Sequence, residues 1–353
     1  MLTPGLRGTA TAALLAIGAV PVSALACATC GCSLSTDAAM GYSTETGWRI
    51  SLQYDFLNQN QLRIGSRSVS PAQLAAINDA GGEQEVEHET INRYTTFGLS
   101  YSPSADWNLR LLVPYVDRGH STYGEATSPI VSEQLSGSTV KGLGDIRFIV
   151  SFQGVLPDKN LGFQLGVKAP TGHYGGPAAD GSGVVGRHPT AFSSGPISQN
   201  ASPGNLVDTS LQPGTGSTDV IAGAYFHRQV ADDVDGFVNS QFQAAVAHRL
   251  DQPGQDFRPG NTTTLSFGVR YEARPSVVPQ LQVNIFRKGR DQGALADNPD
   301  SAGTVAYLSP GVTLTLRDNL QAFGFVQIPV YSHLTGYQLA PRWTASAGLS
   351  YAF

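Results

Sequence analysis

Apolar residues alternate with polar ones in segment after segment of this 353-residue chain. In the clearest segment, 48–56, every second position is apolar, from Trp48 through Tyr54 to Phe56. A period of two places apolar side chains on one face of a β-strand and polar ones on the other. Similar segments are 97–101, 107–115, 146–152, 163–167, 217–230, 236–248, 265–271, 281–285, 304–316, 320–332 and 343–353. The sequence therefore predicts an all-β protein of about twelve strands.

The connections between these segments alternate in length. The short ones are 102–106, 156–160, 231–235, 273–277 and 317–319, and the long ones are 58–89, 119–140, 171–216, 249–255, 289–302 and 333–341. Short periplasmic turns and long extracellular loops are typical of an outer-membrane barrel. A soluble β-sandwich has no reason to place every long loop at one end. We therefore expect a transmembrane antiparallel up-and-down β-barrel over residues 46–353.

Aromatic residues gather at the ends of the predicted strands. Trp48, Tyr101 and Trp107 lie beside short turns or the start of the first strand, whereas Phe56 and Tyr115 lie at opposite ends. Aromatic side chains prefer the headgroup level of a membrane, so two belts are expected of a membrane barrel.

The first long connection contains a helix signal. It reads Ser70-Pro71-Ala72-Gln73, a capping box with proline at the first helical position, and predicts a short helix through Ile77.

The first 26 residues have the features of a secretory signal peptide. Arg7 precedes an apolar stretch over 10–20, and Ala24 and Ala26 provide small residues before the expected cleavage site. Mean hydropathy of −0.10 excludes a helical membrane protein, and a net charge of −5 gives no reason to expect nucleic acid. We expect the mature chain in the bacterial outer membrane, in contact with lipid and lipopolysaccharide.

All three cysteines, Cys27, Cys30 and Cys32, lie in a predicted periplasmic segment, 27–45. Three thiolates so close together can hold Cu(I) or Zn(II) with one further ligand. A disulfide with one free thiol and a lipid on Cys27 are the alternatives. No other cofactor is predicted.

The polar faces of the strands supply candidate pore-lining residues. They are Arg49, Gln53, Asp55, Arg110, Asp145, Arg147, Lys168, Asp219, Arg270 and Gln282. In a membrane barrel this face lines the lumen, where charges tune which solutes pass. The alternative is a closed interior in which these groups pair with one another. Because the cations outnumber the acids, an open lumen should favour anions or neutral polar-aromatic solutes.

Several short motifs resemble those of known outer-membrane proteins. The chain ends on Phe353, as in bacterial outer-membrane proteins whose last strand is read by the barrel-assembly machinery. The segments Gly142–Asp145, Pro170–Gly172 and Gly214–Asp219 are similar to motifs of the family named for the meta-pathway of phenol degradation. That family consists of transporter-like outer-membrane barrels. The resemblance implies uptake of small, often aromatic or apolar compounds, and it supplies no catalytic residues.

The predicted function is an outer-membrane channel or transporter for small solutes, not an enzyme. One alternative is a closed barrel that scaffolds a periplasmic partner or metal-handling protein through the cysteine segment. Another is an outer-membrane lipid hydrolase, which would need a Ser/His pair at the membrane. His120 and Ser121 are adjacent, but they lie in a predicted loop without an obvious third partner.

Overall fold

The computed structural model describes residues 45–172, 174, 192–199, 209–247, 257–293 and 296–353. Most of these residues form strands. The long strands are β1 Gly47–Gly65, β3 Glu87–Ser104, β4 Trp107–Thr122, β6 Arg147–Phe152, β7 Leu161–Lys168, β8 Thr218–Ala231, β9 Val234–Ala247, β10 Thr262–Tyr271, β11 Val277–Lys288, β12 Gly303–Arg317 and β13 Leu320–Ala352. The smaller elements are β2 Arg67–Ser68, β5 Ser136–Leu143, α2 Pro71–Asp79, α3 Pro196–Gln199 and the 3-10 turns Ser132–Gln134 and Thr209–Leu211.

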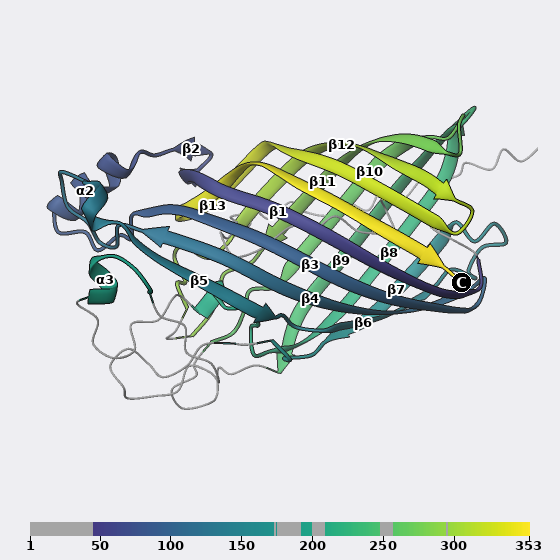
Figure 1. Ribbon diagram of the computed structural model, residues 1–353, viewed down its shortest axis with the longest axis horizontal. Coiled ribbons are helices and arrows are strands. Elements are labelled where there is room, and N and C mark those ends of the chain that lie inside the picture. Colours follow the sequence, from purple (N-terminus) through teal and green to yellow (C-terminus); the bar gives the residue numbers. More distant parts are fainter. Residues whose placement is uncertain (1–44, 173, 175–191, 200–208, 248–256, 294–295) are drawn as a thin grey trace, which may run out of the picture.

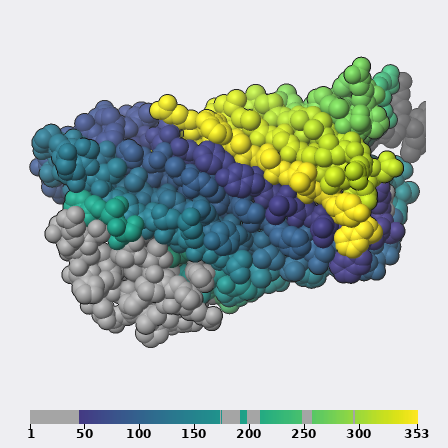
Figure 2. Space-filling view, viewed as in Figure 1, coloured from purple at the N-terminus to yellow at the C-terminus, as the bar shows by residue number. Residues whose placement is uncertain are grey.

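The eleven long strands form a closed antiparallel barrel (Figure 1). Each strand pairs with its sequence neighbour, and β13 pairs back to β1 from Arg49↔Ala352 to Gly65↔Leu334. Beyond this ladder, Phe353 N donates to Trp48 O at 2.9 Å. Figure 2 shows the purple first strand directly against the yellow last one. Closure leaves no sheet edge at this seam.

β13 corrects the predicted strand count and the predicted connection 333–341. It is one 33-residue element, but its first part pairs antiparallel with β12 and its last part antiparallel with β1. Eleven strands that each kept one direction could not close antiparallel, so β13 reverses, and Ala352 N donates to Asn319 O at 2.9 Å. Ten strands contribute one segment each to the barrel wall and β13 contributes two, which gives twelve segments.

The turn in β13 lies at Gly336, whose φ of +53° is in the left-handed region that favours glycine. A Cβ there would also collide with Asp300, which accepts a hydrogen bond from Tyr337 N. Gly336 and Pro341 made this stretch look like a long loop. Pro341 instead lies at an irregularity in the pairing with β1, where a missing N–H is tolerated.

The wall is interrupted between β5 and β6. β5 pairs with Tyr115–Thr122 of β4, and β6 pairs with Trp107–Leu112 of the same strand. The sequence placed 136–139 in a loop because Ser136–Leu143 has few large apolar residues. In the break, a Cβ on Gly172 would lie 2.8 Å from both Gly144 and Gly214. The three glycine-rich motifs of the sequence therefore meet at one point of the fold.

The two faces of the wall differ as the alternation predicts. Large apolar side chains such as Leu52, Leu165 and Val269 are exposed on the outer face. Many buried side chains are polar instead, for example Gln282 and Gln327. Aromatic rings pair at the short-turn rim, with centroids 4.6 Å apart for Trp48–Tyr101. Within the described ranges, no helix is long and apolar enough to cross a membrane.

The described connections differ between the two ends of the barrel. Short turns such as 105–106 and 232–233 lie at the end that holds the C-terminus, whereas α2 and α3 lie at the other end (Figure 1). The predicted helix is confirmed as α2: Ser70 N donates to Gln73 Oε1 at 2.9 Å and Gln73 N donates to Ser70 Oγ at 3.3 Å. Leu74 packs against Leu62 and Leu339, which fixes α2 on the end of the barrel.

Candidate functional site: the barrel interior

The ten predicted pore-lining residues occupy the inner face or the break between β5 and β6. Six are buried, namely Gln53, Asp55, Asp145, Lys168, Asp219 and Gln282. The other four, Arg49, Arg110, Arg147 and Arg270, are partly exposed. They do not form one site, because they divide between the short-turn end and the long-loop end of the barrel. Their role as pore lining stays a prediction.

Arginines gather at the short-turn end. A cavity of about 60 Å³ lies there, lined by Arg49, Arg110, Gln153 and Tyr225 among others. Arg49 pairs with Glu45 at 3.3 Å, and Arg110 Nε donates to Ser100 Oγ at 3.3 Å. The charged side chains that line the cavity are Glu45, Arg49 and Arg110, so one cation is in excess at this mouth.

On the first strand, Asp55 is fully buried and held by neutral groups. Gln53 Nε2 lies 3.0 Å from both carboxylate oxygens, and Ser346 Oγ donates to Oδ1 at 2.5 Å. The ladder explains this grouping, because Asp55 and Ser346 are register partners across the β1–β13 seam. The seam therefore carries a buried acid in the interior.

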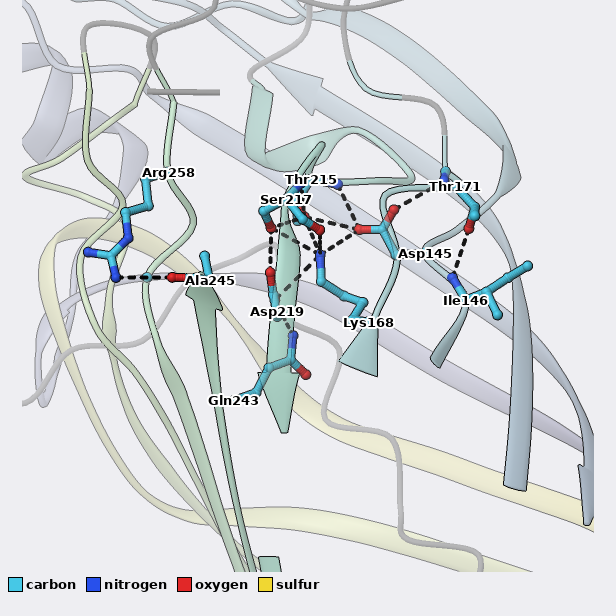
Figure 3. A network of polar contacts seen from close by, with 12 residues as sticks. Asp145, Ile146, Lys168, Thr171, Thr215, Ser217, Asp219, Gln243, Ala245 and Arg258 are labelled. Atoms are coloured by element: carbon cyan, nitrogen blue, oxygen red, sulfur yellow. Dashed lines mark hydrogen bonds and ion pairs between the residues drawn. The ribbon is translucent and has the colours of Figure 1, made fainter. Parts of the chain in front are cut away.

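A buried ion network forms at the long-loop end, around Lys168 at the end of β7 (Figure 3). Its Nζ lies 2.7 Å from Asp145 Oδ2 and 3.4 Å from Asp219 Oδ2. The three side chains are 4%, 6% and 5% exposed. The register explains the arrangement, since Lys168 is the partner of Arg147 on one side and of Asp219 on the other.

The same network holds the chain that enters β8. Lys168 Nζ donates to Ser217 O at 3.0 Å and Ser217 Oγ at 3.1 Å, and it also contacts Thr215 Oγ1. Asp145 accepts from Thr215 N at 3.0 Å and from Gly172 N at 3.1 Å. The glycine-rich motifs thus bring backbone N–H groups close to a buried carboxylate, and glycine permits that approach.

Arg118 of β4 holds the other end of the same stretch. Its Nη1 donates to the carbonyl oxygens of Ser210, Leu211 and Gln212, and its Nη2 donates to Tyr94 OH at 2.8 Å. The side chain is buried. We call residues 209–217 the inner segment, because Arg118 and Lys168 tie it to the inner face of the barrel at two points.

Arg118 was absent from the predicted lining residues. The predicted strand stopped at Tyr115, whereas β4 continues to Thr122. Arg118 continues the even-numbered inner positions that include Arg110, so extending the strand by three residues would have identified it. Its partners in the inner segment are not readable from the sequence, because they lie more than ninety positions away.

The structure separates His120 from Ser121, the two residues that the hydrolase alternative considered, but it places Ser121 against another histidine, His88. His120 and Ser121 are in β4 and not in a loop, and as strand neighbours they face opposite sides. His120 Nδ1 contacts Thr90 Oγ1 at 2.9 Å, whereas Ser121 Oγ contacts His88 Nδ1 at 3.1 Å. Among the described residues, no three His, Cys, Asp or Glu side chains are grouped to hold a metal ion. Cys27, Cys30 and Cys32 lie outside those residues.

Comparison with known proteins shows the fold. No family model matches this chain, and no curated protein matches it. The COG4313 outer membrane channel from Pseudomonas putida F1 matches 89% of this chain and 98% of its own length, with a TM-score of 0.59 and 12% identity. Weaker matches include a Pseudomonas aeruginosa FadL homologue (TM-score 0.40, 10% identity, 87% and 90% covered) and the Ralstonia pickettii toluene transporter TbuX (0.42, 10%, 88% and 90%). The chain therefore has the closed β-barrel fold of an outer-membrane channel.

Proposed function

We propose that this protein is an outer-membrane channel for small solutes, with aromatic or apolar compounds as the preferred class. The observation that carries the proposal is the inverted wall: apolar side chains cover the outside of a closed barrel and polar ones the inside. A sheet of this kind satisfies its backbone hydrogen bonds within a lipid bilayer. The fold likeness to the COG4313 channel supports the same conclusion.

In this proposal the short-turn end faces the periplasm and the long loops face the outside. The positive mouth formed by Arg49 and Arg110 then opens toward the periplasm. Lining charge of this sign disfavours cations and accepts anions or neutral molecules. Acceptance of neutral molecules agrees with the uptake of small aromatic compounds, which the resemblance of the glycine-rich motifs implies.

The inner segment is the part of the channel that we propose controls passage. It belongs to the connection 169–217 and contacts the inner face on both β4 and β7. A solute that enters from the long-loop end meets this segment before it reaches the arginine-lined mouth. Displacing residues 210–212 requires breaking their hydrogen bonds to Arg118.

Single-channel conductance in planar bilayers tests the proposal directly. The full chain should conduct weakly, and Arg118→Met should raise the conductance because it frees residues 210–212. Arg93→Met serves as the matched control, since it removes an arginine that is 39% exposed on the neighbouring strand. Absence of conductance in the parent and in Arg118→Met would contradict a channel.

Such a result would favour the closed-barrel alternative, in which the cysteine segment recruits a periplasmic partner or metal-handling protein. Metal uptake tests that alternative separately. The reduced chain should bind about one Cu(I) or Zn(II), since three thiolates plus one ligand complete a site. A variant with Cys27, Cys30 and Cys32 replaced by serine should lose the metal and keep the barrel.

A further inference from the structure

The wall formed by β9, β10 and β11 carries amide side chains toward the interior. Asn239, Ser266 and Asn284 are register partners across the three strands. Gln282 lies two positions before Asn284, on the same face. Neighbouring strands are about 4.8 Å apart, so the backbones of Asn239 and Asn284 are roughly 10 Å apart. We call Asn239, Gln282 and Asn284 the amide shelf.

The three carbonyl oxygens of the amide shelf are buried and have no hydrogen-bond partner in the part of the chain that the structure describes. They are Asn239 Oδ1, Gln282 Oε1 and Asn284 Oδ1. The residues are 9%, 0% and 9% exposed. A buried acceptor that lacks a donor is costly, so most are paired in folded proteins. Three on one inner face of a barrel point to a ligand or water that supplies donors.

The nitrogen atoms of the two β11 amides are already engaged. Gln282 Nε2 donates to Gln280 Oε1 at 3.2 Å, and Asn284 Nδ2 donates to Gln327 Oε1 at 3.0 Å. If the Asn284 amide were rotated by 180°, its Oδ1 would take the place of Nδ2, which lies 3.0 Å from Gln327 Oε1. Two carbonyl oxygens at that distance repel each other, so the hydrogen-bond network favours the present orientation. At Gln282 and Asn284, the orientation of the network therefore leaves acceptors unpaired and not donors.

Glycine makes room beside the shelf. Gly268 of β10 is the register partner of Gln282, and a Cβ there would lie 3.1 Å from Gln282 Cγ. Gln282 thus extends over a position that has no side chain. The carbonyl oxygen of Gln282 is buried in this arrangement.

The chemistry of the shelf selects the ligand. Neutral amide oxygens accept hydrogen bonds from hydroxyl groups as well as from ammonium groups. Two arginines of the interior, Arg49 and Arg270, pair with Glu45 and Glu272 at 3.3 and 2.9 Å. Arg110 adds a further cation, which disfavours a cationic solute. An anionic group would face three acceptors without a donor. The remaining class is a neutral molecule with a hydrogen-bond donor, of which a hydroxyl group is the simplest.

We propose that the amide shelf is a binding site for the hydroxyl group of a neutral small solute, which it distinguishes from the corresponding ether. In the empty channel, water supplies the donors. A hydroxylated solute replaces that water and donates in its place, whereas an ether cannot donate. This inference deepens the proposed channel function by naming the group that the interior recognises, and it rests on that function for the delivery of solute.

Phenol and anisole form a matched pair for the test, because anisole replaces the O–H by an O–CH₃. The full chain in lipid nanodiscs is dialysed against each compound, and empty nanodiscs correct for partitioning into lipid. The parent should bind phenol about tenfold more tightly than anisole, the expected effect of one hydrogen bond to a buried acceptor. Asn239→Leu with Gln282→Met should abolish this preference.

Gln164→Met is the control, since it makes the same change on β7, where the amide already donates to Ser151 Oγ at 3.4 Å. It should keep the preference for phenol. Equal binding of phenol and anisole by the parent, no binding of either, or an unchanged preference in the double variant would overturn the shelf. Binding is measured without transport, so conductance without a phenol preference refutes only the shelf. A phenol preference without conductance refutes only the channel.

Discussion

Two regions of the interior bury polar groups in different ways. Around Lys168, one cation and two carboxylates meet in a closed network that also holds the inner segment. On the amide shelf, three neutral side chains are buried with unpaired oxygens, and the nitrogens of Gln282 and Asn284 are paired. Buried charges must be paired because their desolvation is costly, whereas a solute or water can satisfy a neutral acceptor. We therefore infer that the charged region holds the inner segment in place and that the neutral region binds solute.

The largest effect is expected from breaking the charged region. Lys168→Met leaves Asp145 and Asp219 buried without their cation and should lower the free energy of unfolding by about 3–5 kcal/mol. Urea-induced unfolding in vesicles measures the change. Lys141→Met is the control, because Lys141 is 53% exposed and its pair with Asp117 should contribute at most about 1 kcal/mol. Equal losses in the two variants would mean that the buried network stabilises the fold no more than an exposed ion pair does.

A smaller loss is expected at the second tether of the inner segment. Arg118→Met removes charge-assisted hydrogen bonds to three carbonyl oxygens and should cost about 2 kcal/mol. The same unfolding assay measures it. Arg118→Lys should recover only part of the loss, since an ammonium cannot reproduce the fork geometry of a guanidinium. Full recovery would show that charge alone matters there.

Removing cations from the interior should change ion selectivity with little change in the free energy of unfolding. Replacing Arg110 of the mouth and Arg147, the register partner of Lys168, by glutamine removes two partly exposed cations from the interior. The reversal potential in a salt gradient should therefore shift toward cation selectivity. A matched Lys141→Gln variant, on the outer face, should leave the reversal potential unchanged. An unchanged potential in the double variant would place the ion path away from these arginines.

The smallest effect is expected on the amide shelf. Asn239→Leu removes a buried amide whose oxygen has no partner, so the free energy of unfolding should change by less than about 0.5 kcal/mol or increase slightly. The result is sharpened by Asn284→Leu, which removes two formed hydrogen bonds and should cost about 1 kcal/mol or more. A large loss in Asn239→Leu alone would mean that its amide is already satisfied.

The sequence predicted the strands whose outer face is most apolar, such as β1 and β11. Lipid selects apolar residues at alternate positions there, so the pattern is strong. It did not predict β5, whose serines and glycines carry little apolar periodicity, or the tight turn at Gly336. Inner positions such as Lys168 could be placed on the inner face by parity. Their partners depend on register and on the path of the inner segment, neither of which leaves a local signal.

The β1–β13 seam has a consequence for the order of assembly. The ladder that joins Arg49 to Ala352 unites the two ends of the barrel sequence, so it can form only after the last residues are available. Until then β1 and β13 are open edges, and open edges are not tolerated in lipid. Contacts between positions so distant in sequence also form slowly. Insertion should therefore be all-or-none and limited by the joining of the two ends, so that defects at the seam reduce the yield of assembled barrel more than the stability of barrels that have already closed.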